Sequence, residues 1–396
     1  MIATLSFACS AILTFAIIRF ATAYKLAYDP VSGELRKVHV QPVPRIGGVG
    51  ILIGLLASGI VLHSGEYWIL LGAALPAFYG GIKEDVTKRA GVLKRLGLSM
   101  GSAALGIVGL GAFVSRIDLP WVDQFMALPL IAWLFTIVAV AGIAHALNII
   151  DGFNGLASGT SLIILSALGY VAYLVGDQTL FYACLAAVGA IFGFFVWNFP
   201  HGKIFLGDGG AYLLGFLIAE ISVLLVQRNP EVSAWFPMLL VAYPVTETLF
   251  SVYRRKFKKG ISPGRPDGVH LHTLIYQRLV RWKVGSKNLK DQTVRNALTS
   301  LYLWGFTLLC ALPAVLFWQN TPILIGAVAA FVFVYLGFYR RLVRFKMPRW
   351  LIIRREVETP VKSVSYVEVR RIKELYVNGH EVEAEEEWVS EKRKGA

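Results

Sequence analysis

The amino-acid sequence predicts an all-α polytopic membrane protein with about eleven transmembrane helices. The chain is 56% hydrophobic and only 16% charged over 396 residues, whereas a soluble domain of this size carries about a quarter charged residues. Apolar runs of about 20 residues, the length that crosses a bilayer, recur along the whole chain. Basic residues gather in every second connection between these runs.

The apolar runs define the expected helices in order. The first run begins almost at Met1 and lacks the basic segment and small-residue cleavage site of a signal peptide, so we expect it to be retained as a span. Hydropathy predicts spans at residues 3–20, 47–63, 67–83, 96–114, 125–145, 160–175, 179–198, 210–227, 234–253, 297–318 and 322–339.

The charge of the connections predicts the orientation of the chain. One set of connections is short and contains only Arg116 and Arg228 as basic residues, whereas the other set includes the basic stretch 254–295 and the tail from Arg340. The positive-inside rule places the basic set in the cytoplasm, with the N-terminus outside and the C-terminus inside. The net charge of +14 then reflects topology and attraction to anionic lipids of the bilayer, and no nucleic-acid partner is expected.

The C-terminal residues form a separate unit by their sequence pattern. We divide the chain into a transmembrane domain, residues 1–340, which holds the candidate catalytic site, and a cytoplasmic appendage, residues 341–396. In the appendage, the alternating pattern and the Asn378–Gly379 pair predict a β-hairpin. The charged end, residues 391–396, is expected to be disordered.

The most distinctive polar segment, residues 145–159, reads HALNIIDGFNGLASG. Asn148, Asp151 and Asn154 recur at a spacing of three, which would place them near one face of a helix. The interleaved glycines allow a backbone to approach a ligand closely. This combination suits a polar, phosphorylated ligand at a membrane edge, and an ordinary loop with capping Asn and Asp side chains is the alternative.

Two adjacent carboxylates, Glu84 and Asp85, follow the third expected span and precede the basic residues Lys88, Arg89, Lys94 and Arg95. Carboxylates at a membrane boundary are costly unless a positive charge meets them. The pattern indicates a site for Mg²⁺ and phosphate, in which carboxylate oxygens bind the hard cation and basic side chains bind the phosphates. An interfacial salt-bridge cluster is the alternative.

A third motif, residues 205–211, reads FLGDGGA and precedes the eighth expected span. Asp208 would lie at a helix N-terminus, where it could cap the helix. Helix N-termini also favour anions, and the glycines leave room for a ligand, so Asp208 is the best metal-ligand candidate after Asp85. Phe205 is a candidate for stacking on a base, although a single aromatic residue is more often part of a core.

The fourth motif, residues 264–272, reads GRPDGVHLH. His270 and His272 point to the same side if this loop is extended. Zinc needs three or four protein ligands, so hydrogen bonding to phosphate or to a base is the favoured role. All four motifs fall on the side assigned to the cytoplasm, which indicates one shared site at the inner face.

Together, the four motifs resemble those of the polyprenyl-phosphate N-acetylhexosamine-1-phosphate transferases, over roughly residues 20–280. The resemblance implies transfer of a sugar-1-phosphate from a UDP-N-acetyl-sugar to undecaprenyl phosphate, giving UMP, as the first membrane step of O-antigen or other cell-envelope polysaccharide synthesis. It implies Mg²⁺ as cofactor, with Mn²⁺ as the alternative ion. It also implies a bacterial inner-membrane protein with its active site on the cytoplasmic face.

The resemblance also implies roles for individual residues. Glu84, Asp85 and Asp208 would be catalytic, with Asp208 the principal metal ligand and Asp85 the second ligand or the residue that positions the acceptor phosphate. The uridine and sugar would be bound by Asn148, Asp151, Asn154 and Phe205. The phosphates would be bound by Lys94, Arg265, His270 and His272.

Three positions depart from the family pattern. Glu84 stands where Asp is usual, and its extra methylene moves the carboxylate by about 1.5 Å. Asn154 replaces an Asp of the bacterial members, as in eukaryotic members, and Thr273 stands where a third His is common.

Three other functions fit the sequence less well. Polar residues within a helix bundle often mark a transport path, but here they gather toward one face, and no paired interrupted spans are visible. A scaffold protein would leave the Gly-rich acidic motifs unexplained. Within the enzyme class, a phospho-N-acetylmuramoyl-pentapeptide translocase is the second candidate. The identity of the N-acetyl-sugar is left open, and so is assembly into a homodimer.

Overall fold

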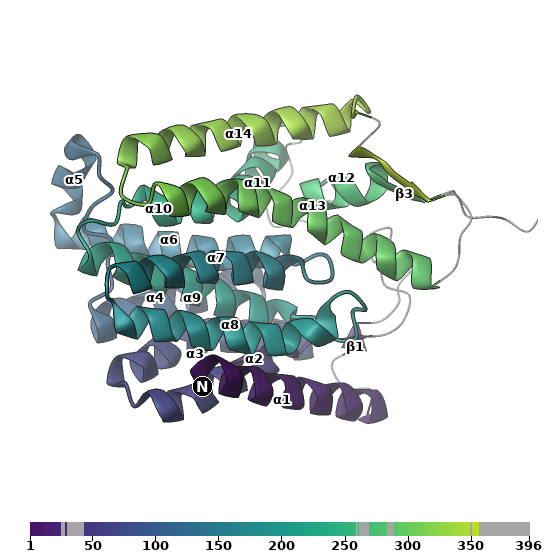
Figure 1. The fold of residues 1–396 in the computed structure, drawn as a ribbon, viewed down its shortest axis with the longest axis horizontal. Helices are drawn as coiled ribbons and strands as arrows, with labels where there is room; N and C mark the ends of the chain where they lie inside the picture. Colours follow the sequence, from purple (N-terminus) through teal and green to yellow (C-terminus); the bar gives the residue numbers. More distant parts are fainter. Residues whose placement is uncertain are drawn as a thin grey trace, which may run out of the picture. The chain divides into compact units, whose positions relative to one another are not determined.

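The computed structural model describes residues 1–24, 28–29, 43–258, 260, 269–282, 289–348 and 351–355. The chain divides into two compact units, residues 1–356 and 357–396. The described part of the first unit is a bundle of helices joined by short loops (Figure 1). The β-hairpin and the disordered end expected in the appendage lie outside the described residues.

The first helices of the bundle are α1 (Ile2–Tyr24), α2 (Gly47–Leu62), α3 (Gly65–Thr87), α4 (Val92–Leu110), α5 (Pro120–Met126), α6 (Pro129–Ile150), α7 (Leu156–Leu174) and α8 (Gln178–Asn198). They are followed by α9 (Gly207–Arg228), α10 (Trp235–Leu240), α11 (Ala242–Tyr253), a π-helical turn at Arg254–Lys258, α12 (Leu271–Arg278), α13 (Leu289–Leu316) and α14 (Thr321–Val343).

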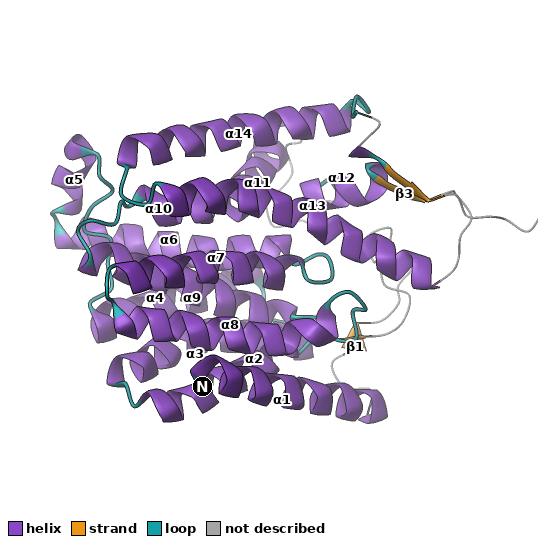
Figure 2. Cartoon of the chain, in the orientation of Figure 1, coloured by secondary structure: helices purple, strands orange, loops and turns teal. Residues whose placement is uncertain are grey.

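Strands are short and peripheral (Figure 2). β1 (Tyr28–Asp29) pairs antiparallel with β2 (Val43–Pro44), so that Tyr28 lies opposite Pro44. β3 (Val280–Trp282) pairs in parallel with β4 (Ile353–Arg355), so that Val280 lies opposite Ile353. The described residues therefore confirm an all-α class for the body of the protein.

Most of each segment predicted as a span is helical in the structure. The predicted span 96–114 extends four residues past the end of α4, and the predicted span 125–145 includes the break between α5 and α6 at residues 127–128. Among the described residues, eight helices are long and apolar enough to cross a membrane: α1, α4, α6, α7, α8, α9, α13 and α14. The apolar helix α2 is shorter, with 16 residues, and α3 carries charged residues in its last turn. The total of about eleven spans and their orientation remain predictions.

The predicted span at residues 234–253 consists of two helices, α10 and α11, that meet at Val241. Pro244 has no N–H and so cannot donate to the carbonyl of Leu240, which explains why one straight helix does not run through this segment. The break was not predicted from hydropathy, because a single proline lowers the mean hydropathy of a window of about 20 residues only slightly.

Helix α9 lies at the centre of the bundle (Figure 1) and packs against α2, α3, α4, α6 and α7. Nearly every residue from Gly207 to Val226 is buried. A helix that is apolar on all sides is stable only when it is surrounded in this way. The position of α9 therefore fixes the place of Asp208 at its first turn.

The first turn of α9 is held by very close backbone packing. A Cβ atom added to Gly48 on α2 would lie 2.4 Å from the Cα of Gly210, and one added to Gly81 on α3 would lie 2.3 Å from the nitrogen of Gly209. Ordinary van der Waals contact begins at 3.4 Å. Glycine is therefore required at these positions for α2 and α3 to reach the start of α9.

The other end of α9 is held by Arg116, in the connection between α4 and α5. Its guanidinium donates hydrogen bonds of 2.7–3.4 Å to the carbonyls of Val226, Asn229, Pro230 and Val232. A cation at a helix C-terminus is stabilised by the unpaired carbonyls and the helix dipole. Arg116 thus fastens the end of α9 that lies away from Asp208.

Asp118 completes this network around Arg116. Its carboxylate pairs with Arg116 and accepts a hydrogen bond of 2.7 Å from the N–H of Ala234. Partial burial works against ionisation, but the N–H of Ala234 and the guanidinium of Arg116 outweigh it and hold the pKa of Asp118 below its ordinary value.

Candidate active site

Asp85, in the last turn of α3, caps the N-terminus of α9. Its Oδ1 accepts a hydrogen bond of 3.0 Å from the N–H of Asp208, and its Oδ2 accepts one of 2.9 Å from Gly209. The first N–H groups of a helix lack partners within the helix and favour a negative charge. This contact brings the two acidic motifs together, although they are separated by more than one hundred residues in the sequence.

Asp208 lies between two arginines. Its Oδ1 is 3.3 Å from Nη2 of Arg45, and its Oδ2 accepts a hydrogen bond from Nη1 of Arg95. Nε of Arg45 is also 3.8 Å from Oδ1 of Asp85. Two carboxyl groups and two guanidinium groups therefore form one cluster.

Arg45 is positioned by backbone pairing between its own segment and the start of α9. The N–H of Phe205 donates to the carbonyl of Pro44 at 2.8 Å, and the N–H of Gly47 donates to the carbonyl of Phe205 at 3.0 Å. Phe205 is half-buried in this pairing, just before Asp208. The predicted stacking of its ring on a base remains a prediction.

Asp151, which follows the last residue of α6, belongs to the same electrostatic environment. Burial raises the pKa of Asp151 to about 7, with Arg45 acting in the opposite direction and the carboxylates of Asp208 and Asp85 adding to the rise. Asp151 is the third acidic side chain that the fold brings to this end of the bundle.

Asn148 lies one turn before Asp151 and beside α9. The hydroxyl of Tyr212, one turn after Asp208, is 3.5 Å from Oδ1 of Asn148 and 3.4 Å from Nδ1 of His145. Asn148 is thus joined through Tyr212 to the first turns of α9, which carry Asp208. Its role in nucleotide binding is not tested by this contact.

Asn154 is engaged in contacts within the protein. Its backbone N–H donates to Oδ1 of Asn296 at 2.7 Å, and its side-chain amide donates to the carbonyl of Pro200 at 3.0 Å. The hydroxyl of Ser300 donates to its carbonyl at 2.7 Å. These bonds fasten the loop after α6 to α13 and to the loop after α8, while recognition of a base by Asn154 stays a prediction.

Glu84 and Lys94 lie beside the cluster rather than within its observed contacts. Oε2 of Glu84 accepts a hydrogen bond of 2.8 Å from the N–H of Ala90 and so closes the turn between α3 and α4. Lys94 is exposed on the first turn of α4, and its neighbour Arg95 is the residue that reaches Asp208. Their predicted roles in catalysis and phosphate binding are not tested by these positions.

The histidine loop meets the loop after α6. The ring of His272 is 5.6 Å from the ring of Phe153, centroid to centroid. A Cβ atom added to Gly152 would lie 3.1 Å from Nε2 of His272. The rings of His270 and His272 are stacked, with centroids 5.1 Å apart. Arg265 lies outside the described residues.

The two histidines differ in their surroundings. His272 is buried, and this burial, with a contribution from the neighbouring His270, lowers the pKa of His272 to about 3. Its imidazole is therefore neutral at physiological pH and offers one donor and one acceptor. His270 contacts a buried carboxylate, Glu247, through Nδ1 at 2.9 Å.

The carboxylates fit the magnesium ion that the family resemblance implies. No group of three or more Asp, Glu, His or Cys side chains converges as a metal site among the described residues. Mg²⁺ does not need such a group, because it is usually bound by one or two carboxylates and by substrate phosphates and water. Asp85 and Asp208 supply two adjacent carboxylates, and each oxygen retains a lone pair beyond its observed hydrogen bond.

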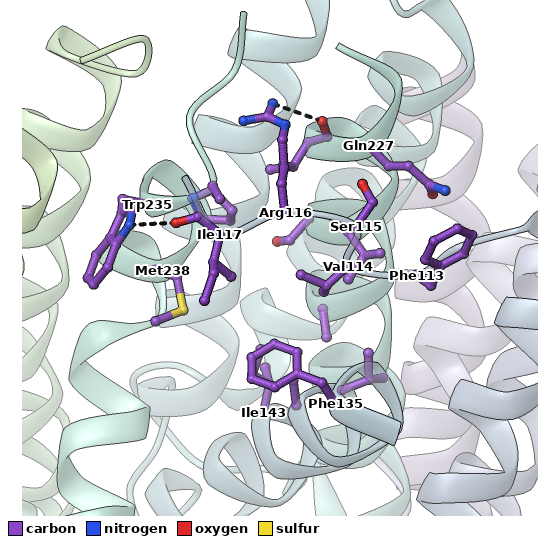
Figure 3. A pocket seen from close by; sticks show the side chains of 18 of the residues that line it. Phe113, Val114, Ser115, Arg116, Ile117, Phe135, Ile143, Gln227, Trp235 and Met238 are labelled. Carbon is purple, nitrogen blue, oxygen red and sulfur yellow. Dashed lines mark hydrogen bonds between the residues drawn. The ribbon is translucent and has the colours of Figure 1, made fainter. Parts of the chain in front are cut away.

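A cavity of about 270 Å³ lies toward the other end of the bundle, among α6, α9, α10 and the connection after α4 (Figure 3). Apolar side chains such as Phe135, Ile143 and Met238 make up most of its lining. Arg116 lines this cavity too, but its guanidinium is bound to backbone carbonyls at the end of α9. The acidic cluster is therefore the better candidate for catalysis.

Residues 67–226, which include Asp85, Asp151 and Asp208, match the model of a family described as glycosyl transferase family 4. A decaprenyl-phosphate N-acetylglucosaminephosphotransferase of Mycolicibacterium smegmatis is 32% identical to this chain over 314 residues, which cover 68% of the chain and 71% of that relative. The chain belongs to the polyprenyl-phosphate N-acetylhexosamine-1-phosphate transferase family. The resemblance carried by the four motifs is confirmed.

Two other members of this transferase family support the same assignment. A probable undecaprenyl-phosphate N-acetylglucosaminyl 1-phosphate transferase of Bacillus subtilis is 32% identical over 243 residues, 60% of this chain and 66% of the relative. An undecaprenyl-phosphate alpha-N-acetylglucosaminyl 1-phosphate transferase of Yersinia pestis is 30% identical over 258 residues, 61% of this chain and 67% of the relative. The matches to these two span about two thirds of each relative's length.

Arg45 was missed as a site candidate in the sequence, and Arg95 was named only as one of four basic residues after Glu84 and Asp85. Arg45 lies in a Pro- and Gly-rich basic stretch, where nothing distinguishes it from the other cations. Arg95 stands in a run of basic residues beside Lys94, and only the rotation of α4 decides which of them faces Asp208. Both residues are identified by their tertiary contacts with Asp208, and spacing along the chain does not reveal such contacts.

Proposed function

We propose that this transferase moves N-acetylglucosamine-1-phosphate from UDP-N-acetylglucosamine to undecaprenyl phosphate or a related polyprenyl phosphate, releasing UMP. The names of its relatives support this donor sugar and this class of acceptor. The observation that carries the proposal is the cluster of Asp85, Asp208, Arg45 and Arg95 at one end of the helix bundle. The reaction would be the first membrane step of a cell-envelope polysaccharide such as O antigen.

The position of the cluster at the ends of α3, α4 and α9 suits a reaction between a lipid and a soluble nucleotide sugar. A polyprenyl chain can stay in the hydrocarbon while its phosphate reaches the helix ends. The positive-inside rule, applied to the basic connections, supports a position of this end on the cytoplasmic face of a bacterial inner membrane, the side on which nucleotide sugars are made.

The proposed chemistry is attack by an oxygen of the acceptor phosphate on the β-phosphorus of the nucleotide sugar. A new phosphorus–oxygen bond forms, and the bond from the β-phosphorus to the oxygen shared with the uridine monophosphate breaks. The acceptor has a second pKa of about 6, so at neutral pH it is largely ionised without a general base. The main barrier is therefore repulsion between two polyanions.

The cluster contains positive charges that would reduce this repulsion. Arg45 and Arg95 place two permanent positive charges beside the carboxylates, and guanidinium groups bind phosphate in a bidentate manner. Mg²⁺ held by Asp208 and Asp85 would add divalent charge for the diphosphate and for the departing UMP. Asp151, Asn148 and the two histidines are assigned to the nucleotide and its phosphates.

The test uses the purified protein in nanodiscs with undecaprenyl phosphate and UDP-N-acetylglucosamine. UMP and lipid-diphosphate-sugar should form in equal amounts, and both should require the lipid. A chelator should stop the reaction, and added Mg²⁺ should restore it, with Mn²⁺ as a second ion to compare. Product from UDP-N-acetylmuramoyl-pentapeptide alone would favour the translocase. Sugar uptake into vesicles without UMP would favour a transporter.

A further inference from the structure

Glu247 lies on α11 inside the bundle, and only 1% of its surface is exposed. Its Oε1 contacts Nδ1 of His270 at 2.9 Å and accepts a hydrogen bond of 3.2 Å from the N–H of Leu271. Its Oε2 accepts a hydrogen bond of 2.7 Å from the hydroxyl of Tyr335 on α14. A buried carboxylate is tolerated when donors surround it in this way.

The same loop is fastened a second time through α14. The hydroxyl of Tyr339, one turn after Tyr335, donates to the carbonyl of Val269 at 3.1 Å. Arg254 donates to the same carbonyl at 2.7 Å. The segment from Val269 to Leu271 is therefore held from α11 and α14 together, and it is not an independent surface loop.

The segment that Glu247 holds is connected to the proposed site through the stacked rings of His270 and His272. His272 contacts Phe153 and approaches Gly152, and these two residues follow Asp151 directly. Any rotation of His270 or of the first turn of α12 would move both rings relative to this loop. Glu247 itself contacts His270 and the start of α12, and no contact is recorded between it and the acidic cluster among the described residues.

We propose that Glu247 is a positioning residue for the transfer reaction. Its carboxylate accepts a hydrogen bond from the Nδ1–H of His270, so that Nε2 of this ring is the nitrogen left to face substrate phosphate. Because it also accepts a hydrogen bond from the N–H of Leu271, Glu247 fixes the position of the first turn of α12 and thereby the position of His272. This inference rests on the proposed function, in which both histidines bind phosphates.

The physical basis is the coupling of the two ring nitrogens in imidazole. The hydrogen bond made by one nitrogen decides which tautomer is present and how the ring is oriented. Where a carboxylate orients a functional histidine in metal sites, its loss reduces activity by about 10–100-fold. Tyr335 occupies the other carboxylate oxygen and so restricts the rotation of Glu247.

The experiment is a double-mutant cycle between Glu247 and His270, using E247Q, H270N and the double variant in nanodiscs. E247Q keeps the size of the side chain but places an amide N–H against a donor. We expect kcat to fall by about tenfold or more, while KM for UDP-N-acetylglucosamine changes less. In the H270N background, E247Q should reduce kcat by less than about twofold, because Glu247 then has no His270 to orient.

Glu220 provides the matched control. It is fully buried on α9, and its carboxylate oxygens have no hydrogen-bond partner among the described residues. E220Q should therefore leave kcat close to that of the unmodified protein. E247D is the conservative variant, since it keeps the charge with a shorter reach, and it should recover part of the loss.

Two results would overturn the inference. One is a value of kcat for E247Q within about twofold of the unmodified protein; the other is an equal loss in the presence and absence of His270. Side-chain nitrogen NMR of the histidines gives a readout without substrate: the Nδ1-protonated signal that disappears in H270N should change in E247Q, and an unchanged signal would also contradict the inference. If the unmodified protein releases no UMP at all, that result contradicts the proposed function and does not bear on the positioning role of Glu247.

Discussion

Replacing Gly81 by alanine should disturb the candidate site without touching any charged residue. A β-carbon at this position would lie 2.3 Å from the nitrogen of Gly209 and 2.4 Å from the carbonyl carbon of Asp208. Both neighbours are backbone atoms, so no flexible side chain can move aside. Since ordinary contact begins at 3.4 Å, α3 and the start of α9 must separate by about 1 Å.

This separation predicts effects on both stability and turnover. Overpacking of this kind costs about 1–3 kcal/mol, and the helix propensity of alanine offsets about 0.5–1 kcal/mol of it. The larger effect is expected on the reaction, because Asp85 and Asp208 sit on the two helices that are pushed apart. A misplacement of about 1 Å in a reacting constellation reduces rate by roughly 100-fold.

Gly72→Ala on the same helix is the matched control, because a β-carbon there would meet nothing within 4 Å. Thermal unfolding in detergent and UMP release in nanodiscs should be measured for both variants. We expect Gly72→Ala to match the unmodified protein and Gly81→Ala to lose most of its turnover while remaining folded. Equal turnover in the two variants would refute the close packing of α3 on the start of α9.

Two further predictions concern the two ends of the bundle. Arg95→Ala should reduce UMP release by more than about tenfold, and by more than Lys94→Ala does, because Arg95 contacts Asp208 directly; the reverse order of effects would favour the sequence-based choice of Lys94. Asp118→Asn should lower the thermal stability at neutral pH, because the folded pKa of Asp118 lies below its ordinary value of 3.8. The stabilisation is therefore present above pH of about 4 and is lost as the pH falls through the folded pKa. Unfolding midpoints of the two proteins should converge in acid, and a constant difference across the pH range would contradict the role of the charge.

Much of the helical architecture could be predicted from sequence because the bilayer imposes a fixed length on apolar segments. Most of each predicted span is helical, but the break at Val241 was missed, since one proline removes a hydrogen-bond donor while changing the mean hydropathy of a long window only slightly. The pairing of Pro44 with Phe205 depends on tertiary contact and has no local signature.

Only part of the candidate site could be predicted from the sequence. Spacing and residue type pointed to Asp85, Asp151 and Asp208, and the fold brings them to one end of the bundle. Arg45 was missed because basic residues are common in its loop. Glu247 could have been identified from the sequence, because it is a carboxylate within a predicted span, where an ionisable residue usually has a specific partner.

The most direct measurement of the central claim is UMP release from UDP-N-acetylglucosamine by the purified Asp208→Asn variant, in the presence of undecaprenyl phosphate and Mg²⁺. Asp123→Asn, at the other end of the bundle, is the matched control, because asparagine keeps the oxygen that accepts a hydrogen bond from the N–H of Ile117. With both variants folded, the proposal predicts no turnover for Asp208→Asn and normal turnover for Asp123→Asn. Near-normal turnover without the Asp208 carboxylate would contradict it.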